Sequence, residues 1–184
     1  MLFSLLHRRD SFLQKPGILK ASVYGANDGI ITTFAVVAGV AGARLQPRII
    51  IILGLANLLA DGFSMGVGDY LGERSEQKLA QRTNSRHNVQ HIWLTGVVTI
   101  TSFVLAGSLP LFPYLLELFG MAVPLEYQLP VSILSTAVAL FLVGSLRTIV
   151  TRGRWWLNGL EVLSVGAIAA AVAYLIGSVI EKMT

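Results

Sequence analysis

Long apolar segments separated by short polar connections make up most of the sequence after residue 20. They cover approximately residues 21–43, 49–72, 91–118, 129–147 and 157–180. A helix needs about 20 apolar residues to cross a hydrocarbon core of about 30 Å, and each segment is long enough to do so. The pattern predicts an all-α polytopic membrane protein with five transmembrane helices, which form a single domain over residues 21–184.

The first 20 residues have a different pattern. Their opening apolar run is only six residues long, because His7, Arg8 and Arg9 follow it. Such a run is too short for the core of a signal peptide. Residues 1–20 are therefore predicted to form a short amphipathic interfacial helix. Its lipid-facing residues would be Leu2, Phe3, Leu6, Phe12 and Leu13.

Composition and charge agree with a membrane protein. Charged residues make up 13% of the chain, whereas soluble domains carry about 25%. Eleven of the fourteen Lys and Arg residues fall on the side of the membrane that holds the N-terminus if all five segments cross it. The positive-inside rule then predicts an N-in, C-out topology, and the basic residues are explained without a nucleic-acid partner.

Motifs for covalent or ATP-driven chemistry are missing from the sequence. There is no cysteine, no Gly-x-Ser-x-Gly motif and no phosphate-binding glycine loop. We therefore expect a secondary transporter rather than an enzyme, with no resident cofactor.

Two aspartates lie at positions where a carboxylate is costly. Asp28 is eight residues beyond Lys20, or about 12 Å into the membrane, and Asp61 is thirteen residues from Arg48, or about 20 Å. An acid at such a depth costs about 2.5–3.5 kcal/mol on insertion scales, so it is a functional candidate by default. The alternative is that both aspartates only hold helices together.

The second apolar segment carries a polar stripe. Asn57, Asp61, Met65 and Asp69 follow one another at intervals of four, which places them along one side of a helix. Carboxylate and amide oxygens combined with a thioether favour Fe²⁺ or Mn²⁺ over an alkaline-earth ion. The alternatives are a core role for Met65, a packing amide for Asn57 and simple solvation for Asp69.

Glycines at intervals of four predict close helix packing around these residues. Gly25 and Gly29 flank Asp28, and the second segment holds two further pairs. These pairs are Gly62/Gly66 and Gly68/Gly72.

The stretches YGANDGIITTFAVVAGVAG and NLLADGFSMGVGDYLGERSEQ resemble the vacuolar iron transporter family. This resemblance implies five transmembrane helices, a homodimer, and export of Fe²⁺ or Mn²⁺ from the cytosol in exchange for protons. It places transport-site roles on Asp28 and Met65. Asn57 stands where some members carry a glutamate, and Asp61, one turn deeper, is the expected replacement. Asp69-Tyr70 is similar to a Glu-Tyr pair of shorter members.

One part of that family's pattern is missing. The long, glutamate-rich metal-binding region after the second helix is replaced here by about twenty residues. The chain thus resembles the short nodulin-like or bacterial branch. We expect it in a bacterial inner membrane or in a vacuolar or other organellar membrane.

The expected function is proton-coupled export of Fe²⁺ or Mn²⁺ through a dimeric pathway lined by the first two helices. The alternatives are a non-transporting membrane scaffold and a passive cation channel. His87 and His91, four residues apart, fit either interfacial packing or a metal entrance. Glu161 fits either a proton acceptor or a cap at the start of the fifth helix.

Overall fold

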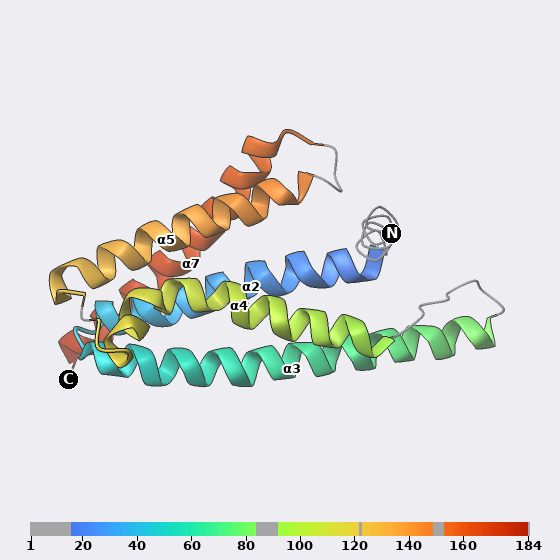
Figure 1. The fold of residues 1–184 in the computed structure, drawn as a ribbon, viewed down its shortest axis with the longest axis horizontal. Helices are drawn as coiled ribbons and strands as arrows, with labels where there is room; N and C mark the ends of the chain where they lie inside the picture. The colour runs from blue at the N-terminus through green and yellow to red at the C-terminus, as the bar shows by residue number, and fades with distance from the viewer. Residues whose placement is uncertain (1–15, 84–91, 122, 149–152, 184) are drawn as a thin grey trace, which may run out of the picture.

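The computed structural model describes residues 16–83, 92–121, 123–148 and 153–183, and every helix or strand found in these ranges is an α-helix. The helices are α2 (Pro16–Gly42), α3 (Pro47–Arg82), α4 (Ile92–Leu118), α5 (Leu125–Leu146) and α7 (Trp155–Met183). Successive helices run in alternating directions, so the start of α2 and the end of α7 lie at opposite ends of the bundle (Figure 1). The all-α prediction is confirmed.

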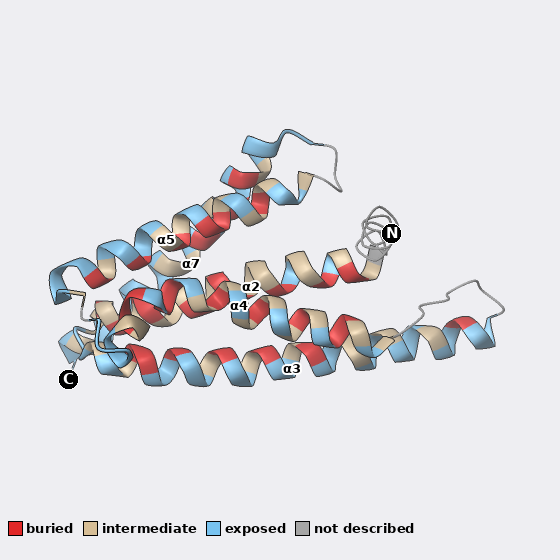
Figure 2. Cartoon of the chain, in the orientation of Figure 1, coloured by how far each residue is buried: buried red, intermediate tan, exposed pale blue. Residues whose placement is uncertain are grey.

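All five helices are long and apolar enough to cross a membrane. Large apolar side chains face outward on every helix, as with Phe63 and Leu105, which are 65% and 72% exposed. Fully buried positions include hydroxyl residues such as Thr33, Thr99 and Ser132. In Figure 2 blue exposed positions recur along α3, α5 and α7, whereas α2 is mostly tan and red. Apolar side chains on the outside and hydroxyl side chains in the interior are expected for a helix bundle that is surrounded by lipid.

The helices α2 and α3 extend well beyond the apolar segments that the hydropathy pattern predicts. The helix α2 begins at Pro16, inside the predicted N-terminal segment, and proline is favoured at the first position of a helix. The helix α3 continues to Arg82, ten residues beyond the predicted end of the second span at residue 72. Its extension is rich in Glu, Gln, Lys and Arg, which are good helix formers in water. The rest of the predicted amphipathic helix, residues 1–15, lies outside the described residues, as do His87 and His91.

The helix α2 contacts each of the other four helices, and glycines allow its closest approach to α4. A Cβ atom added to Gly29 would lie 3.0 Å from the Cα atom of Phe103. One added to Gly107 would lie 2.7 Å from the carbonyl oxygen of Gly29. Here the backbones touch with no side chain between them, so Asp28 on α2 is held on a rigid support.

Among the described residues, basic side chains gather at the end of the bundle where α2 begins. That end holds Lys20, Arg74, Lys78, Arg82, Arg147 and Arg154. The opposite end holds Arg44, Arg48 and Lys182. The alternating helix directions therefore give the charge asymmetry on which the N-in prediction depends.

Candidate functional site

The two aspartates singled out in the first two apolar segments lie near each other on the adjacent helices α2 and α3. Asp28 and Asp61 are half-buried, and they are close enough for a coulombic interaction. Two carboxylates in a low-dielectric environment repel each other, and a cation or a proton between them removes the repulsion. The structure thus brings together the two acids that the sequence singled out.

Thr32 joins the same two helices close to these acids. Its hydroxyl donates to the carbonyl oxygen of Asp28 at 2.9 Å and accepts from the Nδ2 atom of Asn57 at 3.5 Å. This long hydrogen bond links α3 to α2 beside Asp28, and it leaves the Oδ1 oxygen of Asn57 available to a metal ion.

The predicted polar stripe of α3 lies at the margin of its buried face. Asn57, Asp61, Met65 and Asp69 are all half-buried, whereas Leu58, Gly62 and Gly66 beside them are buried. Met65 also packs against the apolar core that includes Leu58 and Phe103. A core role and a ligand role for Met65 are therefore compatible, because its side chain lies at the boundary between the two environments.

Asp69 belongs to a second group, separate from Asp28 and Asp61. It is eight residues from Asp61, or about 12 Å along the helix. Two oxygens that bind one ion at 2.0–2.6 Å lie at most about 5 Å apart, so Asp61 and Asp69 would bind an ion in succession. Asp69 accepts a hydrogen bond from the hydroxyl of Thr99 on α4, a residue with no exposed surface.

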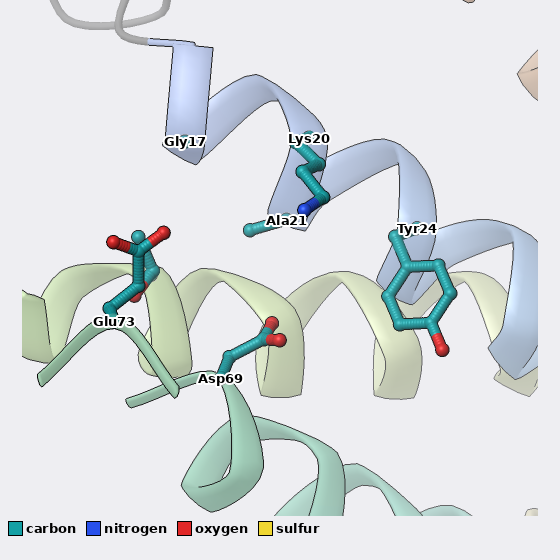
Figure 3. A pocket seen from close by; sticks show the side chains of 7 residues that line it. Gly17, Lys20, Ala21, Tyr24, Asp69 and Glu73 are labelled. Carbon is teal, nitrogen blue, oxygen red and sulfur yellow. The ribbon is translucent and has the colours of Figure 1, made fainter. Parts of the chain in front are cut away.

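A small pocket of about 40 Å³ lies beside Asp69 at the end of the bundle where α2 begins. Its lining consists of Gly17, Lys20, Ala21, Tyr24, Asp69, Glu73 and Thr95. In Figure 3 the carboxylate of Asp69 points up from α3 into the space below α2. The pocket lies among the basic residues of this end, and Asp69 is placed to receive a cation arriving there.

Sequence reasoning missed Thr32 and Thr99, the two hydroxyl residues that position the site. Threonines in apolar helices often bond only to their own backbone, as Thr101 does to the carbonyl oxygen of Val97. Nothing in the sequence distinguishes Thr101 from Thr32 or Thr99, because the difference depends on which face meets a neighbouring helix.

The described residues bring two acids near each other but no larger group of metal-binding side chains. Within the described ranges, no three His, Cys, Asp or Glu side chains come together in a group that could bind a metal ion. Asp28 and Asp61 would supply two carboxylates to a bound ion, with Asn57 and Met65 on the neighbouring turns of α3. Mn²⁺ and Fe²⁺ commonly take six ligands in octahedral sites, so an ion bound here would need further ligands from water or from another chain.

Glu161 is not placed to cap α7, because it lies beyond the first turn of that helix. It forms an ion pair with Arg147 of α5, with 3.5 Å between Nη1 and Oε2, and its side chain is 59% exposed. The cap interpretation is therefore wrong, and the ion pair joins the ends of α5 and α7 instead.

The known proteins that this chain resembles belong to one group. The family model described as "VIT family" matches residues 19–91 and 78–178, which is most of the chain. The vacuolar iron transporter of Plasmodium berghei is 25% identical over 89% of this chain and 82% of its own length. Vacuolar iron transporter homolog 3 of Arabidopsis thaliana is 29% identical, over 87% of this chain and 84% of its own length.

A shorter match has higher identity. The vacuolar iron transporter of Toxoplasma gondii is 39% identical over 80 residues, which are 44% of this chain. This match spans only 26% of the Toxoplasma protein, so most of that relative has no counterpart in the alignment.

Proposed function

This chain belongs to the VIT family, and on that basis we propose that it is a membrane transporter for Fe²⁺ or Mn²⁺. It carries the metal out of the cytosol in exchange for protons. The names of the relatives support iron as a substrate and an organellar membrane as the location. The donor set supports both metals, because oxygen ligands with one thioether suit Fe²⁺ and Mn²⁺.

The single observation that carries this proposal is a pair of neighbouring carboxylates, Asp28 and Asp61, on two adjacent helices that are long and apolar enough to cross a membrane. A scaffold protein has no use for two acids that repel each other there. A transporter does, because the bound cation removes the repulsion. Protons compete with metal for carboxylate oxygens, so protonation from the far side would release the ion.

The active form in this proposal is a homodimer, in which α2 and α3 of each copy line a shared pathway. A second set of Asp28, Asp61, Asn57 and Met65 completes the coordination that one chain lacks. An exposed row of small residues runs along α3 beside the polar stripe and supports a close approach of two copies there. The row consists of Ala56, Ala60, Ser64, Gly68 and Gly72.

Within one chain, nothing lies within 4 Å of a Cβ atom added to Gly68 or Gly72. Gly62 and Gly66, by contrast, pack against α4, so only one of the two predicted glycine pairs is used inside the chain. The other pair is available to a partner.

Replacing Gly68 with isoleucine is expected to weaken dimerisation at least tenfold while leaving the monomer folded. The new side chain has room in the monomer but would keep the α3 helices of two copies apart. The molar mass of the protein in detergent, measured by light scattering over a concentration series, checks this. The matched control is Ala171→Ile, at an exposed position of α7, which should leave the mass unchanged. A Gly68→Ile variant that dimerises as the wild type does would contradict the proposed interface.

Metal flux with a simultaneous pH readout in proteoliposomes tests the transport function. We expect uptake of Fe²⁺ and Mn²⁺ into acid-loaded liposomes, with a matching rise of the internal pH. Flux without proton movement would indicate a passive channel instead. If the protein shows no flux and calorimetry detects no Mn²⁺ binding, the result would indicate the scaffold.

A further inference from the structure

The pocket beside Asp69 contains a positive charge that transport of a cation does not require. Lys20 lines it together with two acids, Asp69 and Glu73. Figure 3 shows the Lys20 side chain extending from α2 with its amine directed toward the Asp69 carboxylate. Repulsion by an ammonium group works against an arriving metal ion, so the lysine at this place needs an explanation.

The groups around the Lys20 amine are held in place by the fold. Thr99, which is fully buried, donates a hydrogen bond to Asp69. One carboxylate oxygen of Glu73 is buried, and this residue lies one turn beyond Asp69 on α3. Lys20 itself lies in the second turn of α2, which the glycine contacts fix against α4. The pocket is therefore a preformed space whose charged lining consists of two acids and one lysine.

The Lys20 amine and a metal ion would compete for the same carboxylates. Asp69 and Glu73 are the two acids that line this small pocket, and Lys20 lines it with them. An ammonium group beside two carboxylates repels a divalent ion that approaches them. Binding a metal ion beside Asp69 is therefore expected to drive the amine away.

We infer that Lys20 is a tethered competitor, which occupies the pocket beside Asp69 until a divalent ion displaces it and so selects divalent over monovalent cations. This inference rests on the proposed function, and it assigns the selectivity of the same pathway to a residue outside the metal ligands.

The physical argument is one of effective concentration. A group attached by a short linker competes at an effective concentration on the order of millimolar or more. A K⁺ or Na⁺ ion carries no more charge than the ammonium and gains little by replacing it. A divalent ion carries twice the charge and interacts about twice as strongly with Asp69 and Glu73.

Calorimetric titration of Mn²⁺ into the full-length protein in detergent tests the inference. In buffer without added K⁺, we expect Lys20→Met to bind Mn²⁺ five- to tenfold more tightly than the wild type. Adding 150 mM K⁺, a concentration on the order of physiological ionic strength, should weaken binding by the variant at least fivefold more than binding by the wild type. Lys20→Arg keeps the charge and should bind no more tightly than the wild type.

Two further variants separate this role from general electrostatics. Lys78→Met removes the same charge from an exposed site near the same end of the bundle, outside the pocket, and should change Mn²⁺ affinity less than twofold. Asp69→Asn should eliminate the gain produced by Lys20→Met, because the two groups act at one place.

The inference is overturned if Lys20→Met binds Mn²⁺ with wild-type affinity, if Lys78→Met gives an equal gain, or if the wild type binds no Mn²⁺. Absence of flux in a wild-type protein that binds Mn²⁺ would count against the proposed transport alone. The comparison of binding affinities would still decide the role of Lys20.

Discussion

Replacing Asp61 with asparagine is expected to abolish Mn²⁺ uptake into acid-loaded proteoliposomes, with a loss of at least about 100-fold. Asparagine has nearly the same shape, so α3 can pack on α2 as before, but the carboxylate charge near Asp28 is lost. Changes to groups that only support a metal ligand cost 10–100-fold, and loss of a charged ligand costs at least as much. Asp28→Asn should have the same effect.

Stability measurements distinguish this loss from misfolding. Without metal, Asp61→Asn removes one of two charges that repel each other, so its unfolding temperature should equal or exceed that of the wild type. Addition of Mn²⁺ should stabilise the wild type, because a ligand that binds only the folded state raises its stability, and should not stabilise the variant. Thermal unfolding in detergent measures both effects.

A control for surface charge is available at the opposite end of the bundle. Glu117→Gln removes an exposed carboxylate near the end of α4 and should leave uptake within twofold of the wild type. Wild-type flux in both Asp28→Asn and Asp61→Asn would refute the proposed site.

The five spans could be predicted from the sequence because each membrane-spanning helix needs its own run of apolar residues, whatever its neighbours are. Apolar length alone identified them, with no knowledge of which helix contacts which. The ends of the helices could not be predicted in this way. The helix α2 begins at Pro16, before its apolar segment starts, and α3 ends at Arg82, after its apolar segment has ended. In both places the backbone preferences of the local residues extend the helix.

The candidate site was only partly predictable, for a related reason. The interval of four along α3 grouped Asn57, Asp61, Met65 and Asp69 correctly on one side of the helix. The partners of these residues depend on how α2 and α4 cross α3. The sequence therefore did not indicate that Asn57 bonds to Thr32 or that Asp69 bonds to Thr99. It also did not show that Gly66 packs inside the chain and Gly68 does not.

The second large effect is expected from a single methyl group at Gly29. An alanine there would place its Cβ 3.0 Å from the Cα and carbonyl carbon atoms of Phe103, and closer still to the carbonyl oxygen. These are backbone atoms of a packed helix, so they cannot move aside as the end of a flexible side chain can. We expect Gly29→Ala to destabilise the bundle by about 2–3 kcal/mol, the upper part of the range for overpacking.

The same helix provides the control. A Cβ atom added to Gly39 would lie 3.6 Å from the carbonyl oxygen of Ala173, which is an ordinary contact. Gly39→Ala should therefore be neutral or stabilising, since alanine is favoured over glycine in a helix by about 1 kcal/mol. Equal unfolding temperatures for the two variants would contradict the close contact of α2 and α4. Because Gly29 adjoins Asp28, separating α2 from α4 there would also displace the Asp28 carboxylate relative to Asp61. Gly29→Ala should thus lose Mn²⁺ affinity even at temperatures where it remains folded, whereas Gly39→Ala should retain it.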